Sequence, residues 1–135
     1  MGALKILVAD DHTDFRKVVC AFLERLPNIN VVGEAEDGVD VIDKTEAFDP
    51  DVVLMDISMP LRDGLEATRI IKNRWPTKKV VIATMHDSAL YRLQAEEVKA
   101  DGFIVKSSIR SSLLATFGGG VFSPVYDSVR VQGGK

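Results

Sequence analysis

Short apolar runs alternate with amphipathic segments along the first 117 residues of the chain. The runs are rich in β-branched residues and are bounded by turn-forming residues, which is typical of strands buried on both faces of a sheet. The clearest run, VVLM, follows Pro50 and stops at Asp56. In all, the pattern predicts five strands, at residues 4–9, 30–35, 51–55, 78–84 and 102–105.

The segments between these runs carry apolar residues at helical spacing, which predicts amphipathic helices. The first such helix begins near Thr13 and carries an apolar stripe formed by Phe15, Val18, Val19, Phe22, Leu23 and Leu26. Four further helices are predicted, at residues 37–47, 63–75, 88–99 and 109–117. In the helix at 88–99, the buried side is expected to be Leu90, Leu93 and Val98.

Strict alternation of strands and helices indicates an α/β fold, with parallel strands joined by right-handed crossovers and helices on both faces of the sheet. The chain reads ADDHTDF after the first strand, so it lacks the glycine-rich fingerprint of dinucleotide-binding folds. We therefore expect a flavodoxin-like, doubly wound, five-stranded parallel sheet with strand order 2-1-3-4-5. This domain would span residues 1–117, and residues 118–135 would be a linker stub or flexible tail, or alternatively a short docking strand.

Composition adds a few exclusions to this picture. With 46% hydrophobic and 27% charged residues, the chain resembles soluble globular proteins. Its net charge of -3 provides no general attraction to nucleic acid or to an anionic membrane. The sequence contains no apolar run of the ~18 residues that a membrane span needs, and no signal peptide. We therefore expect a cytoplasmic location without membrane contact.

Side chains that can bind ligands or react follow four of the predicted strands, at the edge of the sheet where α/β proteins bind ligands. They are Asp10, Asp11, Asp56, Thr84 and Lys106. Three neighbouring carboxylates repel one another unless a cation intervenes, and a set of oxygen ligands suits Mg²⁺ better than zinc. A metal ion, an ammonium group and a hydroxyl group together would stabilise a phosphoryl group on Asp56, which predicts an aspartyl-phosphate.

These residues, in this order, resemble the receiver domains of bacterial two-component response regulators. The resemblance covers roughly residues 4–117 and rests on the segments LKILVADD, VVLMDISMP, LRDGLEA, VVIATMH and ADGFIVK. The sequences of these segments are most similar to those of the subfamily that carries a helix-turn-helix output domain. The resemblance therefore implies phosphorelay signalling and transcription regulation.

For the site, the resemblance implies that a sensor histidine kinase phosphorylates Asp56 and that the chain itself has at most weak autophosphatase activity. Asp11, Asp56 and the main-chain carbonyl of Ser58 would bind Mg²⁺, with Asp10 acting through water. Lys106 would pair with the phosphoryl oxygens, so that the implied catalytic set is Asp56, Thr84 and Lys106.

The resemblance also implies a conformational switch, in which Thr84 moves toward the phosphoryl group and Phe103 rotates with it. Ser58 and His86 occupy the two positions that tune dephosphorylation in this family. The chain departs from the common pattern in several places, among them Ser107, which follows Lys106 where many relatives have a cis proline. Met85 lies on the route that Phe103 would take, and Lys99 replaces a helix-ending glycine, where a left-handed conformation would cost ~1 kcal/mol.

Other functions of the same fold remain open at this point. They are a non-phosphorylated protein-interaction module, a Mg²⁺-dependent phosphohydrolase with Asp56 as nucleophile, and a flavin carrier. If the chain signals, its partners would be a histidine kinase and either an output domain or a separate protein, without direct nucleic-acid contact by this chain. Homodimerisation through the fourth and fifth helices is a further possibility.

Overall fold

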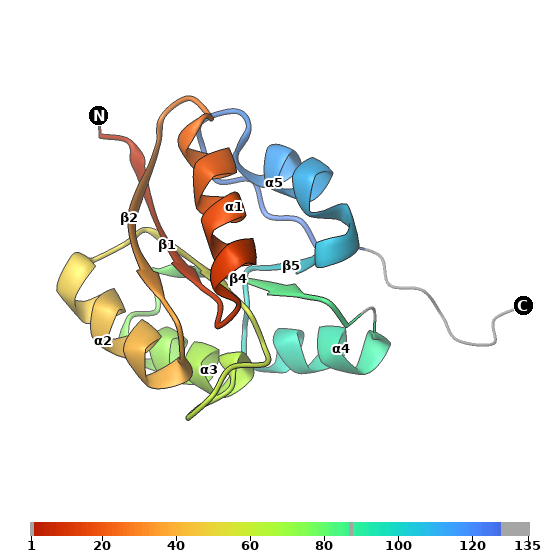
Figure 1. Ribbon diagram of the computed structural model, residues 1–135. Coiled ribbons are helices and arrows are strands. Elements are labelled where there is room, and N and C mark those ends of the chain that lie inside the picture. The colour runs from red at the N-terminus through yellow and green to blue at the C-terminus, as the bar shows by residue number, and fades with distance from the viewer. Residues whose placement is uncertain (1, 87, 128–135) are drawn as a thin grey trace, which may run out of the picture.

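A computed structural model describes residues 2–86 and 88–127 of the 135-residue chain. Its centre is a parallel sheet with helices on both faces (Figure 1). The strands are β1 (Leu4–Ala9), β2 (Ile29–Ala35), β3 (Val52–Met55), β4 (Lys79–Thr84) and β5 (Gly102–Val105). They lie in the order β2-β1-β3-β4-β5 with every neighbouring pair parallel, so the predicted flavodoxin-like fold is confirmed.

Five helices divide into two layers over the sheet. They are α1 (Thr13–Glu24), α2 (Gly38–Phe48), α3 (Gly64–Arg74), α4 (Ala89–Glu97) and α5 (Ile109–Phe117), and a 3₁₀ turn, Lys106–Ser108, precedes α5. Helices α1 and α5 pack on one face, whereas α2, α3 and α4 cover the other (Figure 1). Each layer has its own buried cluster of apolar side chains, because every strand contributes side chains alternately to the two faces. Among the described helices, none has the length and apolar character required to cross a bilayer.

Side-chain caps fix the start of three helices close to the carboxyl edge of the sheet. The carboxylate of Asp37 accepts hydrogen bonds from the amides of Val39 and Asp40 at the start of α2. Asp63 and Ser88 cap α3 and α4 in the same way. Each cap satisfies main-chain donors that a helix leaves unpaired, which defines where the loop ends and the helix begins.

The predicted buried side of α4 is wrong for two of its three residues. Leu90 and Leu93 are 63% and 57% exposed. The residues of α4 that pack on the sheet are Ala95, which is fully buried, and Tyr91, four residues earlier. The helix is therefore rotated by about one position from the orientation that its leucines indicate. Val18 of α1 is likewise 66% exposed, although the spacing placed it in the apolar stripe.

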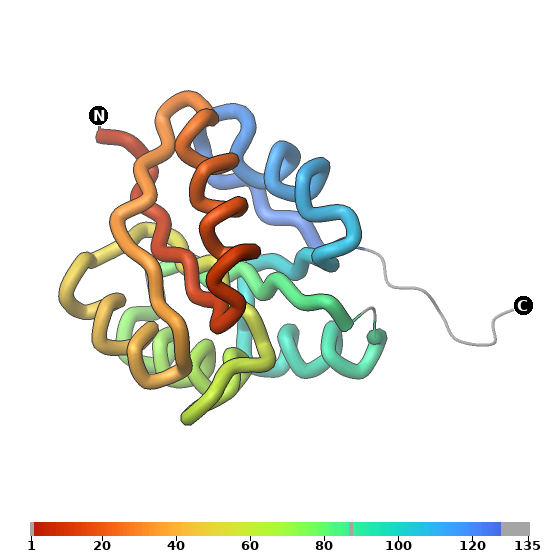
Figure 2. The backbone as a smooth tube through the Cα atoms, in the orientation of Figure 1, coloured from red at the N-terminus to blue at the C-terminus, as the bar shows by residue number. Residues whose placement is uncertain are grey.

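The prediction for Lys99 is confirmed, because this residue has a positive φ of 67° just after α4. The chain beyond α5 also has a definite course as far as residue 127. It runs back toward the sheet (Figure 2). There, Tyr126 forms a parallel bridge with Phe103 of β5. This pairing corresponds to the docking-strand alternative. The remainder of the predicted tail, residues 128–135, lies outside the described part of the chain, and a domain boundary at residue 117 stays a prediction.

Candidate functional site

The register of β1 and β3 brings two of the predicted acids together. Ala9, the last residue of β1, is paired with Met55, the last residue of β3. Asp10 and Asp56 follow directly, and the amide of Asp56 donates to the carbonyl of Ala9 over 2.9 Å. Carboxylate oxygens of Asp10, Asp11 and Asp56 lie within 4.8 Å of one another. Asp10 and Asp56 are buried, whereas Asp11 is exposed.

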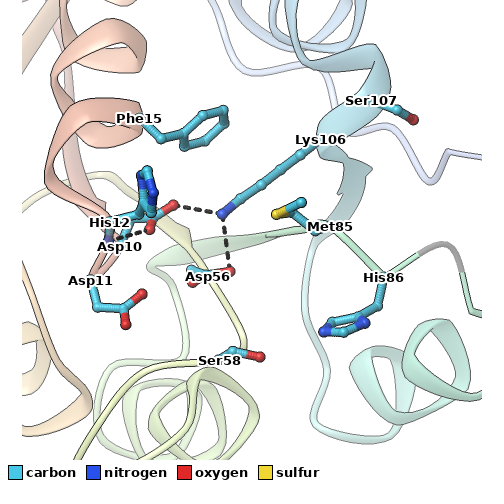
Figure 3. Close-up of a pocket in the computed structure, with 10 residues that line it drawn as sticks. All are labelled: Asp10, Asp11, His12, Phe15, Asp56, Ser58, Met85, His86, Lys106 and Ser107. Atoms are coloured by element: carbon cyan, nitrogen blue, oxygen red, sulfur yellow. Dashed lines mark hydrogen bonds and ion pairs between the residues drawn. The ribbon is translucent and has the colours of Figure 1, made fainter.

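Lys106 joins this cluster from the end of β5. Its Nζ donates to Oδ2 of Asp10 over 2.7 Å and to Oδ1 of Asp56 over 3.2 Å (Figure 3). The same ammonium group lies 4.5 Å from the ring centroid of Phe15, which is a cation–π distance. Two carboxylates and one aromatic face thus hold the ammonium group at one position.

The acid–base properties of Asp56 reflect its burial. Removal of the carboxylate from water raises its pKa from 3.8 to about 6; Lys106 lowers it and the neighbouring Asp10 raises it further. Burial dominates because the ionised form loses hydration that one ammonium group does not fully replace. An additional cation next to Asp56 would therefore relieve an unfavourable charge.

A hollow of about 620 Å³ opens over the cluster. Its lining includes the carboxylates and the ammonium group just described, together with Ser58, Met85 and His86. Figure 3 shows these side chains around the opening, with Ser58 below Asp56 and His86 on the side away from Asp10. The hollow is therefore large enough to hold an anion beside the acids, and exposed lining residues such as Asp11 and His86 give it access from solvent.

The donor set of this hollow fits Mg²⁺. Hard divalent ions of this size prefer carboxylate, carbonyl and water oxygens. Asp10, Asp11 and Asp56 supply carboxylate oxygens, and Ser58 lines the same hollow. Cys20 is a buried residue of the apolar layer under α1 and does not line this hollow. The arrangement would hold a hard cation between the carboxylates without a sulfur ligand.

Two predicted site residues are placed differently from the others. Thr84 ends β4 at the same edge, but it is 1% exposed and its Oγ1 accepts a hydrogen bond from the amide of His86 over 3.0 Å. Phe103 is fully buried within β5 and does not line the hollow. The structure therefore gathers Asp10, Asp11, Asp56 and Lys106 directly, and places Thr84 and Phe103 beside that group in the sheet.

Arg16 is a residue of the site that the sequence analysis missed. It is 8% exposed, its Nη1 donates to the main-chain carbonyl of Asp10 over 2.6 Å, and its Nε donates to Glu34 over 2.8 Å. Arg16 thus connects the main chain just after β1, where the acidic pair begins, to Glu34 on β2. The available signal was its helical spacing with Val19 and Leu23, which places position 16 on the buried side of α1.

Gly64 controls how closely α3 approaches Asp56. Its amide donates to the carbonyl of Ile57 over 2.8 Å. A β-carbon at this position would lie 1.8 Å from the main-chain oxygen of Asp56, which no real structure tolerates. The motif LRDGLEA therefore has a structural reason for its glycine, since only a residue without a side chain permits this contact.

Comparison with known proteins decides what this site belongs to. Residues 6–117 match the family described as the response regulator receiver domain. The chain belongs to that family. The resemblance noted from the strand-end residues is thereby confirmed, and the chain is a receiver domain of two-component signalling.

Individual relatives agree with this assignment. The receiver domain is 36% identical over 111 residues to the transcriptional regulatory protein DegU of Brevibacillus brevis, covering 82% of this chain and 47% of that protein. It is 40% identical over 106 residues to a protein-glutamate methylesterase/protein-glutamine glutaminase of Pseudomonas fluorescens, covering 78% of this chain and 28% of that protein. The chain thus spans less than half the length of these curated relatives.

Solved structures show the same fold. The signal receiver domain of the putative response regulator NarL from Mycobacterium tuberculosis superimposes with a TM-score of 0.77 at 31% identity, covering 84% of this chain and 95% of that one. A LuxR-family two-component response regulator from Aurantimonas sp. SI85-9A1 gives a TM-score of 0.83 at 31% identity, covering 94% of this chain and 91% of that one. The acidic hollow thus lies in a receiver fold.

Proposed function

We propose that this receiver domain accepts a phosphoryl group on Asp56 from a sensor histidine kinase, with Mg²⁺ bound at the acidic hollow, and changes conformation to control an output. The observation that carries the proposal is the position of the Asp56 carboxylate, which is buried beside two other acids and 3.2 Å from the ammonium group of Lys106. Nucleophile, cation ligands and a counter-charge for the phosphoryl oxygens therefore converge at one point.

Each residue has a distinct part in the proposed transfer. Asp10, Asp11 and Asp56, with the carbonyl of Ser58, would hold Mg²⁺, which supplies charge neutralisation for the phosphoryl oxygens. A carboxylate oxygen of Asp56 attacks the phosphorus atom as the phosphorus–nitrogen bond to the donor histidine breaks. The imidazole keeps that electron pair, so the chain needs only to position and neutralise charge. Lys106, already bonded to Asp56, pairs with the incoming oxygens.

The response to phosphorylation would pass through β4 and β5. A phosphoryl group adds about two negative charges and three acceptor oxygens. The hydroxyl of Thr84 is one donor available at this edge. It now accepts a hydrogen bond from the amide of His86, and its movement toward the phosphoryl group would break that bond. Phe103 would follow Thr84, since the two strands are paired. Ser58 and His86, at the mouth of the hollow, are placed to tune the access of water to the phosphoryl group.

For the output, we propose transcription control in the cytoplasm through a partner or output domain. DegU is a transcriptional regulatory protein, and the Aurantimonas neighbour is a LuxR-family response regulator. The receiver domain itself would not contact nucleic acid, in keeping with its net charge of -3. Self-association would use α4 and α5, whose surfaces expose Leu90, Leu93 and Leu114.

Intact mass spectrometry after incubation with Mg²⁺ and acetyl phosphate tests the central step. The wild-type chain should gain the mass of one phosphoryl group, Asp56→Asn should gain none, and Asp43→Asn, an exposed acid on α2, should behave as wild type. Uptake by Asp56→Asn at the wild-type level would refute the assignment. Rapid multiple turnover would instead favour a phosphohydrolase, and no modification of the wild type would favour a non-phosphorylated interaction module.

A further inference from the structure

The outer edge of β5 is occupied by the chain's own C-terminal segment. The amide of Phe103 donates to the carbonyl of Val125 over 2.8 Å, and the amide of Asp127 donates to the carbonyl of Phe103 over 2.7 Å. These two bonds flank the parallel bridge between Phe103 and Tyr126. Because an edge strand otherwise presents unpaired main-chain groups that attract another strand, residues 125–127 fill a position that a peptide from elsewhere would also fit.

Tyr126 fixes the segment through its side chain. Its ring stacks on Phe103, with centroids 6.2 Å apart and planes inclined by 17°. Its hydroxyl donates to the carbonyl of Ala100 over 2.6 Å, and the guanidinium group of Arg92 lies 5.4 Å from the ring centroid. Tyr126 thus covers the aromatic side chain that we propose to move during switching, and it also contacts α4.

Asp127 connects the same segment to the turn that carries Lys106. Its Oδ2 accepts hydrogen bonds from the amide of Val105 over 2.9 Å, from the hydroxyl of Ser112 over 2.8 Å and from the hydroxyl of Ser108 over 3.1 Å. Val105 directly precedes Lys106 and is paired with Thr84 of β4. The hydrogen bonds of this one carboxylate therefore depend on the position of the end of β5.

We propose that the edge of β5 between α4 and α5 is a recognition site for an extended segment in which tyrosine is followed by aspartate. Residues 125–127 of the same chain fill this site. Phosphoryl capture at Asp56 weakens their docking. The inference rests on the proposed phosphoryl transfer. Movement of Thr84 and Lys106 toward a phosphoryl group displaces Val105, whose amide bonds Asp127, and draws Phe103 away from Tyr126.

Thermodynamic reciprocity makes the proposal measurable. If phosphoryl capture weakens the docked segment, the docked segment must weaken phosphoryl capture by the same factor. Release would leave the β5 edge and the pocket of Tyr126 open to an extended partner segment of the same chemistry. The C-terminal segment would then be an intramolecular competitor for that site.

The test compares full-length variants for binding of beryllium trifluoride with Mg²⁺, an inert mimic of the phosphoryl group, by calorimetry. Tyr126→Ala and Asp127→Asn should bind the mimic about 5- to 20-fold more tightly than wild type, within the usual range of such couplings. Val121→Ala, at an exposed position between α5 and the docked segment, should change affinity less than about twofold. Tyr126→Phe, which retains the stacked ring but loses the bond to Ala100, should have a smaller effect than Tyr126→Ala. Hydrogen exchange in the wild type should show that the mimic exposes the amides of Phe103, Val105 and Asp127.

The outcomes separate this inference from the function on which it rests. If no variant, including the wild type, binds the mimic, the proposed phosphoryl site fails and the coupling fails with it. If the wild type binds and the segment variants bind equally well or more weakly, the phosphoryl site stands and the coupling is overturned. Unchanged protection of Phe103 and Asp127 on binding would overturn it as well. The near-isosteric Asp127→Asn keeps the comparison valid if Tyr126→Ala does not fold.

Discussion

The ammonium group of Lys106 donates to the carboxylate of Asp10 over 2.7 Å, and the two side chains are only 9% and 5% exposed. Its bond to Asp56 is longer, at 3.2 Å. Lys106 is therefore shared between two of the acids that we propose as Mg²⁺ ligands. The ammonium group competes with a bound cation for these carboxylates. Removing it should therefore change the affinity for Mg²⁺ in a definite direction.

We expect Lys106→Ala to bind Mg²⁺ about fivefold more tightly than wild type at pH 8, because loss of a neighbouring positive charge favours a cation. The same variant should keep the fold and lose the conformational response to phosphorylation. Calorimetric Mg²⁺ titration measures the first effect, and NMR shifts in α4 with and without the phosphoryl group measure the second. Lys79→Ala, an exposed lysine of β4, is the control. Weaker Mg²⁺ binding by Lys106→Ala would contradict the competition.

The raised pKa of Asp56 predicts how stability depends on pH. The folded chain binds this proton near pH 6 and the unfolded chain near 3.8, so folding favours the protonated form. Ionised Asp56 therefore destabilises the fold above about pH 6, and this penalty disappears as the pH falls toward 3.8. Asp56→Asn should be more stable than wild type at pH 8, by on the order of 2 kcal/mol, and similar to it near pH 4.

Urea unfolding in the presence of a chelator at several pH values measures this difference. Asp43→Asn controls for the general loss of one negative charge and should track the wild type throughout. An advantage of Asp56→Asn that is constant with pH would show that the gain does not come from the ionisation of Asp56.

Arg16 offers a test of how the acidic pair is positioned. Arg16→Ala removes the bond to the carbonyl of Asp10 and leaves Glu34 with fewer partners, so we expect a loss of about 3 kcal/mol in the free energy of unfolding and weaker Mg²⁺ binding. Lys17→Ala is a matched control, because Lys17 carries the same charge and also pairs with Glu34 but is exposed. It should cost less than about 1 kcal/mol. Equal effects of the two substitutions on stability and Mg²⁺ binding would contradict a positioning role for Arg16.

The sheet and the acidic cluster were predictable because both follow from short-range signals. Buried parallel strands are almost wholly apolar, so the runs before Asp10, Asp56 and Lys106 were visible, and side chains that follow parallel strands share one edge. The left-handed conformation of Lys99 was anticipated in a different way, from the family resemblance, because Lys99 stands where relatives often have a glycine that ends the helix.

Other features depend on packing that no local pattern encodes. Leu90 has the apolar character of a core residue, but α4 meets the sheet through Tyr91 and the small Ala95 instead. A docking strand in the C-terminal tail was offered only as an alternative and without naming Tyr126, because its pairing uses main-chain groups of β5 and a single bridge has no periodicity. The helical spacing of Arg16 indicated its burial, but its partners did not follow from that spacing: they are the carbonyl of Asp10, just after β1, and Glu34 on β2.

Gly64 provides the most stringent test of the geometry around Asp56. Alanine is favoured over glycine in a helix by about 1 kcal/mol, so Gly64→Ala would stabilise α3 if space allowed. A β-carbon 1.8 Å from the carbonyl oxygen of Asp56 must instead push the loop that carries Asp56 away. We expect a net loss of about 3 kcal/mol in stability and reduced phosphoryl uptake from acetyl phosphate, measured by chemical denaturation and intact mass. Gly119→Ala, where a β-carbon meets nothing within 4 Å, should retain both properties, and wild-type uptake by Gly64→Ala would mean that the loop around Asp56 tolerates displacement.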